Sequence, residues 1–426
     1  MPKGLQVQVL SPALIARKMA HVISLLRRNR DYRLLYFAQV ISYAGDWFAT
    51  VALVGLVFKR TGSDFATTLV WVAASLPAFL VTPWAGPTAD RFDRRRIMLA
   101  CSVAQASLTG LYFVGQHQWV GFAIGGQALI AGAAAFFTPA SGAALANLVD
   151  PDDLPTAANM SSATWGAMLA IGSAIGAIVA DTFGRTAAFA GDTASFIVAG
   201  LLITRVKRAT QKAGPTTAPG TRMHPIRDTV VALRFARNHD IIRSLLISKA
   251  GFGFGTGVVG LLAVLAKRRF ASGDGDGGTG VLLVARGVGV LFGPALLKRA
   301  MKKGLPTVLT ACGYGAIAYG LFYGLVPIPS TIGVAAIFVL LAHVGGGVQW
   351  GGCFYGLQQA SPDELRGRII AADFALVTVS MSISLVAAGL LSDRFGPRPV
   401  MFGLAGIEVA WGCAFLAMTR RVRRSR

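Results

Sequence analysis

The stretch GPTADRFDRRR at residues 86–96 sets a glycine–proline pair between two long apolar runs and follows it with arginines. The same arrangement returns as GPALLKRAMKK at residues 293–303. Three further pairs of short matches have nearly the same offset: Pro151–Leu154 with Pro362–Leu365, Asp181–Gly184 with Asp393–Gly396, and Asn29–Asp31 with Asn238–Asp240. An offset close to half of the chain predicts two halves of the same topology.

Apolar runs of about twenty residues, the length that crosses a bilayer core, surround these repeats. The chain has 426 residues, of which 54% are hydrophobic and 14% are charged, whereas soluble domains carry about 25% charged residues. The runs therefore predict an all-α polytopic membrane protein with twelve transmembrane helices. Their approximate centres are Gly45, Leu76, Ser107, Ile130, Ile171, Ile197, Val258, Val288, Gly315, Leu340, Met381 and Val409.

These runs divide the chain into five segments. We expect a cytoplasmic N-terminal segment at 1–33, a six-helix half at 34–204, a cytoplasmic linker with a short amphipathic helix at 205–242, a second half at 243–419 and a basic tail at 420–426. The first eighteen residues lack an apolar run long enough to span a membrane, which favours a disordered or dispensable segment. Either Met1 or Met19 fits as the start.

The basic residues indicate how the chain is oriented. The formal net charge of +22 would suggest a nucleic-acid partner in a soluble protein, but here Lys and Arg flank apolar spans. On the side of both termini lie 31 of the 41 basic residues, and only 8 lie on the other side. The positive-inside rule therefore places both termini in the cytoplasm and predicts contact with anionic lipid there and no nucleic-acid partner. The cluster Lys267, Arg268 and Arg269 is the main exception.

The motifs resemble those of the major facilitator superfamily. Residues 86–96 resemble its signature cytoplasmic loop between helices 2 and 3, with Asp93 in place of the usual second glycine. The drug and siderophore efflux branch, with macrolide-efflux and enterobactin-exporter-like members, is suggested by further stretches: Asn29–Leu34, Gly45–Trp47, Phe137–Ala140, Leu154 with Ala158 and Asn159, and Leu365–Arg368. The resemblance implies two six-helix halves, related by a pseudo-two-fold axis along the membrane normal, with a substrate site between them.

The signature stretch predicts a conformational latch. A carboxylate at a helix end that faces arginines and the N-terminus of a helix in the other half would hold the cytoplasmic side closed. In the second copy Leu297 occupies the position of the acid, so only the first half keeps it. The alternative is that the charges merely enforce the topology. The latch candidates are Gly86, Asp90, Arg91, Arg94 and Arg95.

Two departures from the family pattern concern proton antiport. The stretch Gly172–Ala177 lacks the proline of the family's helix-5 antiporter motif but keeps its small residues. The helix-4 stretch at 127–132 lacks the intramembrane arginine of many drug antiporters. Proton exchange is therefore expected from the family resemblance and not from these two motifs. A transport-incompetent receptor or assembly protein is the alternative that the changed helix-5 motif leaves open.

Six ionisable residues fall at membrane depth, where each is a functional candidate by default. Asp46, flanked by aromatic residues in the first helix, is the leading proton or cation site, although a buried acid satisfied by its neighbours is the alternative. Arg286 and Glu408 lie in the same half and are candidate counter-ions of each other, with separate functional charges as the alternative. Lys249 and Asp373 lie near enough to the cytoplasmic surface to snorkel. The coupling candidates are Asp46, Asp192, Arg286 and Glu408.

Aromatic and amide side chains suggest a cavity for a bulky amphipathic substrate. The glycine-rich stretch around Gln349 and Trp350 would allow close approach of a substrate, and His343 fits a satisfied core residue better than a proton carrier. Core packing is the alternative for each aromatic. The cavity candidates are Trp47, Phe48, Gln127, Gln349, Trp350 and Phe354.

Together these features favour a secondary exporter of amphipathic small molecules such as drugs, macrolides or siderophores, exchanged for protons in a bacterial inner membrane. A lipid or lysophospholipid translocator on the same fold is the closest alternative. The sequence has no G-x-x-x-x-G-K-[S/T] phosphate loop and none of the H-E-x-x-H or G-x-S-x-G catalytic motifs, so we expect no enzyme activity and no cofactor or metal. A monomer is expected because the duplication already supplies both halves.

Overall fold

The computed structural model describes residues 12–210, 225–270 and 276–424. Within these residues the fold consists of helices joined by short turns, with no strand. Twelve helical stretches are long and apolar enough to cross a membrane, and the twelve centres expected from the sequence each fall inside one of them. The prediction of an all-α polytopic fold with twelve membrane helices is confirmed.

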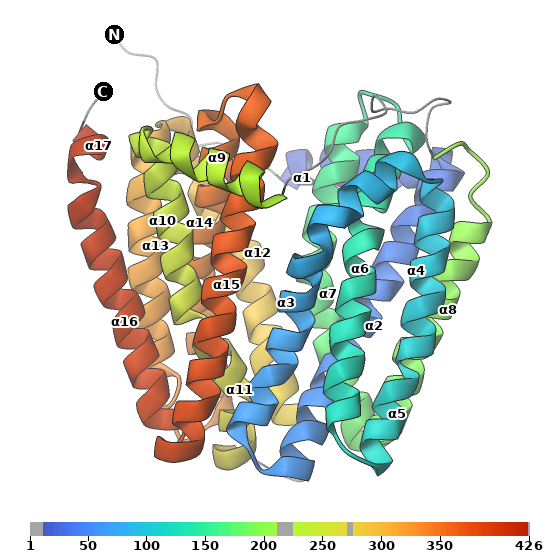
Figure 1. Ribbon diagram of the computed structural model, residues 1–426, viewed down its shortest axis with the longest axis horizontal. Coiled ribbons are helices and arrows are strands. Elements are labelled where there is room, and N and C mark those ends of the chain that lie inside the picture. Colours follow the sequence, from blue (N-terminus) through green and yellow to red (C-terminus); the bar gives the residue numbers. More distant parts are fainter. Residues whose placement is uncertain (1–11, 211–224, 271–275, 425–426) are drawn as a thin grey trace.

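The first bundle is built by α2 to α8, drawn in blue to green in Figure 1. Two of its helices, α4 and α5, form one span that is interrupted at Thr109, whose hydroxyl lies 2.7 Å from that of Thr193. The helices are α2 (Arg30–Thr61), α3 (Asp64–Arg91), α4 (Arg94–Leu108), α5 (Gly110–His117), α6 (Gly121–Leu148), α7 (Leu154–Thr182) and α8 (Arg185–Thr204).

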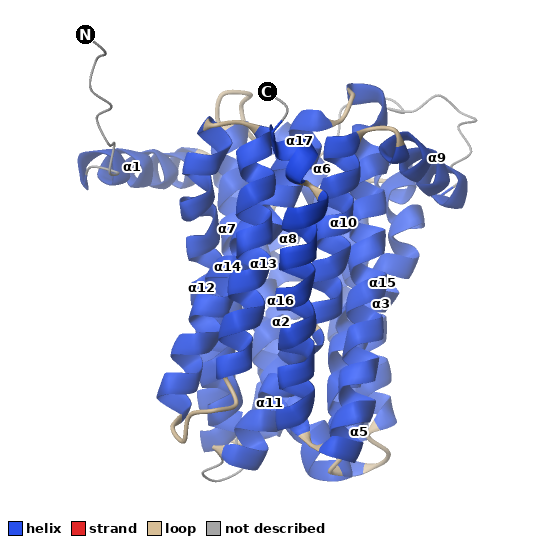
Figure 2. Ribbon diagram, turned by 90° about the vertical axis from the view of Figure 1, so that its left-hand side faces the viewer, coloured by secondary structure: helices blue, strands red, loops and turns tan. Residues whose placement is uncertain are grey.

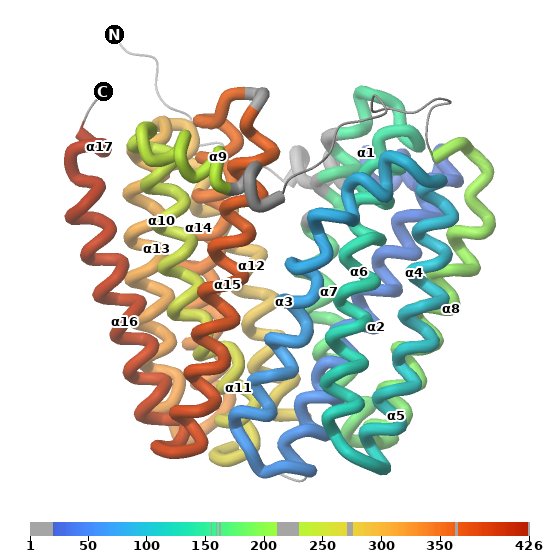
Figure 3. Tube along the Cα trace, in the orientation of Figure 1, coloured from blue at the N-terminus to red at the C-terminus, as the bar shows by residue number. Residues whose placement is uncertain are grey.

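The second bundle contains α10 to α16 and is drawn in yellow to red. Its first span is broken at Thr256 into α10 and α11, which follow each other from one end of the bundle to the other (Figure 3). Ser384 bridges the break: its hydroxyl accepts from the Gly257 N–H at 2.9 Å and donates to the Phe254 carbonyl at 2.5 Å. This satisfies backbone groups that lipid could not. The helices are α10 (Asp240–Gly255), α11 (Gly257–Arg269), α12 (Asp276–Lys302), α13 (Leu305–Leu325), α14 (Ile332–Ala360), α15 (Asp363–Phe395) and α16 (Pro397–Met418).

Three further helices gather at one end of the molecule, which we call the terminal end; the other is the distal end. They are α1 (Pro12–Arg28), α9 (Pro225–Arg237) and α17 (Arg420–Arg424). Figure 2 shows α1 and α9 lying across the direction of the bundles rather than along it. The amphipathic helix expected in the linker is thus present as α9. The segment of eighteen residues predicted to be disordered or dispensable is helical from Pro12 onward, where α1 begins.

Each bundle has its own apolar core. In the first, Leu53 of α2 and Phe189 of α8 are fully buried in one cluster. In the second, Leu262 of α11, Val339 of α14 and Met401 of α16 are buried together. The cluster of the first bundle also includes Ala263, Leu283 and Leu385 of the second bundle, so the two cores are in contact where the bundles meet.

The two bundles meet mainly through two pairs of helices, α3 with α15 and α7 with α12, and α11 and α12 make smaller contacts with α2 and α3. The second pair approaches closely: a Cβ atom on Gly287 of α12 would lie 2.7 Å from the backbone nitrogen of Ala170 in α7. Inside the first bundle, a Cβ atom on Gly176 of α7 would lie 2.6 Å from the Phe48 carbonyl oxygen of α2. Small residues therefore let α7 pack tightly on one side against its own bundle and on the other against the second bundle.

Candidate functional site between the bundles

A polar cluster joins the bundles at the distal end. The Asp393 carboxylate at the end of α15 accepts hydrogen bonds from the Ser63 hydroxyl at 2.8 Å and from the Asp64 N–H at 2.6 Å, where α3 begins. The buried Asp64 carboxylate in turn accepts from the Ser392 hydroxyl at 2.6 Å and pairs with Arg268 at 2.8 Å. A carboxylate of one bundle therefore caps the first helix turn of the other.

A second distal cluster occupies the corresponding place between α7 and α12. Asp276, the first residue of α12, is 1% exposed at its side chain and pairs with Lys267 at 2.6 Å and with Arg185 of the first bundle at 2.9 Å. A Cβ atom on the next residue, Gly277, would lie 2.5 Å from the Asp181 carboxylate at the end of α7. The acids of the two clusters correspond to each other in the repeat. Asp64 of one cluster corresponds to Asp276 of the other, and Asp393 corresponds to Asp181.

The distal clusters explain the exceptional basic residues of the sequence. Lys267 pairs with Asp276, Arg268 with Asp64, and Arg269 donates to the Pro329 carbonyl at 3.0 Å. Asp64 and Asp276 were not among the residues predicted from the sequence. Their shared offset and their position at the start of a predicted span were the available signal.

The signature stretch has a different setting at the terminal end. Helix α3 continues to Arg91, so Gly86 lies in its last turns and not in a loop. Its counterpart Gly293 likewise lies inside a helix, α12. The actual loop is short, and Asp93 there caps α4 by accepting from the Arg96 N–H at 2.8 Å. A capping function accounts for the acid that replaces the family's second glycine.

The expected latch is not formed in this conformation. Asp90 and Arg91 are exposed, and neither has a hydrogen bond or ion pair within the described part of the chain. Arg94 is buried and donates to the carbonyls of Ala89 and Ala143, at 3.2 and 3.1 Å, while Arg95 donates to backbone carbonyls at the end of α8. The arginines therefore bind their own bundle, whereas the distal end holds polar contacts that join the bundles.

An arginine and three tryptophans meet between the bundles at mid-membrane depth. The guanidinium carbon of Arg286, on α12, lies 5.5 Å from the Trp71 ring centroid and 5.8 Å from that of Trp47. Trp47 also contacts Trp165 of α7 edge-on, with centroids 5.7 Å apart. Trp47 was predicted as a cavity residue and Arg286 as a coupling residue, and the structure brings the two together across the interface.

The expected pairing of Arg286 with Glu408 is wrong. Glu408 is 1% exposed, and neither of its carboxylate oxygens has a hydrogen-bond partner among the described residues. It faces the break between α10 and α11, where a Cβ atom on Gly255 would lie 2.4 Å from its Oε2. The two residues share a bundle, but Arg286 points to the first bundle and Glu408 points inward.

Two carboxylates lie close together within the first bundle. Asp192 of α8 is buried, and its Oδ1 would be 2.7 Å from a Cβ atom on Gly45, the residue before Asp46. The Ser195 hydroxyl lies 3.5 Å from the same oxygen. Asp46 itself is half-buried. The structure therefore places the two acidic coupling candidates on facing helices, at a depth where charge is costly.

Lys249 and Asp373 form a buried ion pair and do not snorkel to the surface. Their charged atoms are 2.5 Å apart, and both side chains are at most 1% exposed. The Lys249 ammonium also lies over the rings of Trp350 and Phe374, at 4.0 and 4.5 Å from their centroids. Partners on α14 and α15 that the sequence could not assign thus satisfy the lysine.

The remaining cavity candidates do not form one lining with Trp47. Gln349 is 0% exposed and donates to the Ser248 carbonyl at 3.0 Å, so in this conformation it is buried within the second bundle. Gln127 accepts from the Tyr112 hydroxyl at 2.8 Å inside the first bundle, and Phe48 packs between α7 and α8. Phe354 is exposed. His343 is buried and contacts the Tyr323 hydroxyl at 3.2 Å, in agreement with a core residue.

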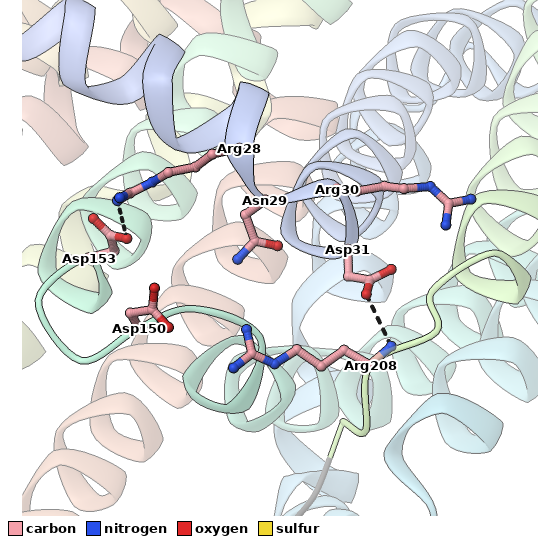
Figure 4. Close-up of a pocket in the computed structure, with 7 residues that line it drawn as sticks. All are labelled: Arg28, Asn29, Arg30, Asp31, Asp150, Asp153 and Arg208. Atoms are coloured by element: carbon pink, nitrogen blue, oxygen red, sulfur yellow. Dashed lines mark hydrogen bonds and ion pairs between the residues drawn. The ribbon is translucent and has the colours of Figure 1, made fainter.

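A polar pocket of about 330 Å³ lies at the terminal end, within the first bundle and not between the bundles. Figure 4 shows Arg28 paired with Asp153, and the Arg208 N–H donating to Asp31 at 3.0 Å. Asn29 caps α2 by accepting from the Tyr32 N–H at 2.9 Å. These contacts anchor the start of α2. The pocket is lined by Arg28, Asn29, Arg30, Asp31, Asp150, Asp153 and Arg208.

Two helical bundles that contact each other from the distal end to mid-membrane depth, with the charged Arg286 at the interface there, define a polytopic membrane transporter of the major facilitator type. A family model of that superfamily, described as a transmembrane secretion effector, matches residues 24–421. The chain belongs to this family.

Relatives and solved structures agree with this assignment. The chain is 27% identical over 397 residues to the multidrug efflux pump Tap of Mycolicibacterium fortuitum, covering 87% of this chain and 91% of Tap. It is 31% identical over 147 residues to the lysophospholipid transporter LplT of Salmonella paratyphi B, covering 34% and 35%. The fold is similar, with a TM-score of 0.72 and 13% identity over 93% of this chain and 99% of the other, to a bacterial homolog of the human lysosomal transporter Spinster, crystallised in an inward-facing, unoccupied conformation.

Proposed function

We propose that this transporter exports amphipathic small molecules from a bacterial cytoplasm by alternating access, in exchange for protons. The observation that carries the proposal is the asymmetry of the contacts between the bundles. Polar clusters close the distal end, whereas Asp90 and Arg91 at the terminal end are exposed and unlatched. This is the arrangement expected of a state that receives substrate at the terminal end.

The charge distribution supports the orientation of the chain that export requires. Most Lys and Arg residues lie at the terminal end, so the positive-inside rule puts that end in the cytoplasm. The basic helices α1 and α9 then lie at the inner surface, where anionic lipid is the expected partner. The relation to the multidrug efflux pump Tap supports export of small molecules. A monomer suffices because both halves are present in one chain.

Proton coupling rests on the unpaired acids at membrane depth. Asp46 is half-buried beside Asp192, and Glu408 is buried without a hydrogen-bond partner within the described residues. A carboxylate in such surroundings can take up a proton from one side and release it to the other when the surroundings change. We assign the leading coupling function to Asp46 because it is the sequence neighbour of Trp47, whose ring contacts Arg286 of the second bundle.

A lysophospholipid translocator is the second candidate. The relation to LplT supports it, although the match covers about a third of each chain. An amphipathic lipid and an amphipathic drug have similar requirements, namely an apolar path with a few polar contacts.

Reconstitution into liposomes tests both candidates. With an imposed pH gradient, we expect accumulation of dyes, macrolides or siderophores that depends on the gradient. Movement of labelled lysolipid without any of these solutes would favour the second candidate. If folded protein moves none of the probes, both candidates fail.

A further inference from the structure

Three unpaired hydrogen-bond donors lie together where the bundles meet. The Nε and Nη1 atoms of Arg286 and the Nε1 atom of Trp71 are buried and have no acceptor among the described residues. Each carries an N–H group and none can accept. The Trp71 side chain is nine-tenths buried and its ring lies 5.5 Å from the guanidinium carbon. A buried donor without an acceptor is costly. A bound molecule that supplies an acceptor would therefore stabilise this cluster.

The protein itself supplies no counter-ion for Arg286 in the part of the chain that the structure describes. Glu408 faces the helix break at Gly255, and no ion pair links Arg286 to Asp46. Behind the arginine, in its own bundle, His343 and Tyr323 are engaged with each other at 3.2 Å. A guanidinium stays charged at any physiological pH. The position therefore carries a full positive charge between the bundles.

An apolar surface extends from this charge toward the terminal end. Trp47 connects Trp71 to Trp165, through ring contacts of 6.2 and 5.7 Å. Trp165 is 42% exposed, and Leu291, five residues after Arg286 toward the terminal end of α12, is also exposed. A molecule with one polar end would therefore find the donors at its head and an aromatic wall along its body.

We propose that Arg286 and Trp71 bind the anionic oxygens of the transported molecule, a carboxylate or a phosphate, while its apolar body packs on Trp47 and Trp165. This inference rests on the proposed function and narrows its substrate class to anionic amphipaths. A guanidinium matches a carboxylate or phosphate with two parallel hydrogen bonds, and it repels a cationic head of the same size.

Equilibrium binding to matched probes tests the inference without any transport step. The protein is held in nanodiscs of neutral lipid, and energy transfer from tryptophan to pyrene reports binding, with empty nanodiscs as the blank. The soluble probes are 1-pyrenebutyrate, 1-pyrenebutanol and 1-pyrenemethylammonium. The lipid probes are lysophosphatidic acid and the neutral monoacylglycerol of the same chain, measured by displacement of pyrenebutyrate. The two sets distinguish a soluble acid from a lipid headgroup as the source of the anion.

The wild-type protein is expected to prefer each anionic probe to its neutral partner. Arg286→Gln should weaken pyrenebutyrate binding about tenfold and leave pyrenebutanol unchanged, since one charge-assisted contact is lost. Arg286→Lys should restore part of the affinity, and Trp71→Phe should weaken the anion about threefold. Arg243→Gln is the matched control, because Arg243 is an arginine of the same bundle that pairs with Asp240 at the terminal end.

Undiminished pyrenebutyrate binding by a folded Arg286→Gln variant would overturn the inference, as would a wild-type preference for the ammonium probe. Neither result would affect the proposed export, which the liposome assay tests separately. Conversely, protein that binds pyrenebutyrate through Arg286 but moves no solute would leave this site in place and remove the transport proposal.

Discussion

The Asp393 carboxylate accepts a hydrogen bond from the backbone N–H of Asp64 at 2.6 Å, so that the end of α15 caps the start of α3 in the opposite bundle. The contact is made at the distal end, which must open if substrate is to leave on that side. Opening requires α3 to lose its cap and Asp64 to lose Arg268 and Ser392. The distal clusters therefore set part of the free-energy difference between the two transport states.

The first prediction concerns Asp393→Asn. The amide keeps the shape of the side chain but loses the charge that favours a helix N-terminus. The population of distal-open molecules should therefore rise, by about threefold to tenfold. The effect is no larger because Asp393 is exposed and solvent screens its charge. Spin labels at Thr61 and Arg394, in a background without Cys413, would report it as a longer distance. Asp152→Asn, an exposed acid at the terminal end, should leave the distances unchanged. Equal distances in both variants would exclude the capping contact as a determinant.

The second prediction concerns the terminal end. If the Asp90 latch forms when the terminal end closes, Asp90→Asn should abolish transport while leaving the amount of folded protein unaltered. Measurement is by uptake into proteoliposomes of known protein content. Asp93→Asn is the control: it removes a charge only three residues further along the chain, but asparagine still caps α4. Normal transport by Asp90→Asn would refute the latch.

The sequence could predict whatever its local pattern determines. Span length and the offset of the repeats predicted the twelve helices and two bundles, and the periodic apolar residues predicted α9. Even the mistaken loop at Gly86 follows from a general rule, since a glycine–proline pair usually ends a helix. In a membrane the helix continues past the pair to Arg91 because lipid offers no partner for free backbone groups.

Partners distant in the chain could not be predicted in this way. Asp64 meets Asp393 across most of the sequence, and Lys249 finds Asp373 on another helix. Arg286 and Glu408 looked like counter-ions because they share a bundle. The direction in which each side chain points, however, depends on how its helix is rotated about its own axis. Sequence periodicity cannot predict that rotation when all faces of a helix are apolar.

The third prediction tests proton coupling at Asp46. Asp46→Asn cannot exchange a proton, so solute accumulation driven by a pH gradient should fall to the level seen without a gradient. Exchange of labelled for unlabelled solute at equal pH should persist, because it needs no net proton movement. The comparison with Asp192→Asn separates the two neighbouring acids. Retention of full gradient dependence by the Asp46 variant would remove this residue as the coupling site.

The last prediction uses the buried pair of Lys249 and Asp373. Lys249→Met leaves the carboxylate buried and unpaired, which should cost about 3–5 kcal/mol of stability. The double variant Lys249→Met with Asp373→Leu removes both charges, so most of that loss should be recovered. Thermal unfolding of the purified variants measures both effects, and a single variant as stable as the double one would contradict the pairing. If the stable double variant still transports, the pair is structural. If it folds but does not transport, the two charges take part in the transport cycle, and their place between Trp350 and Phe374 becomes a second coupling site alongside Asp46.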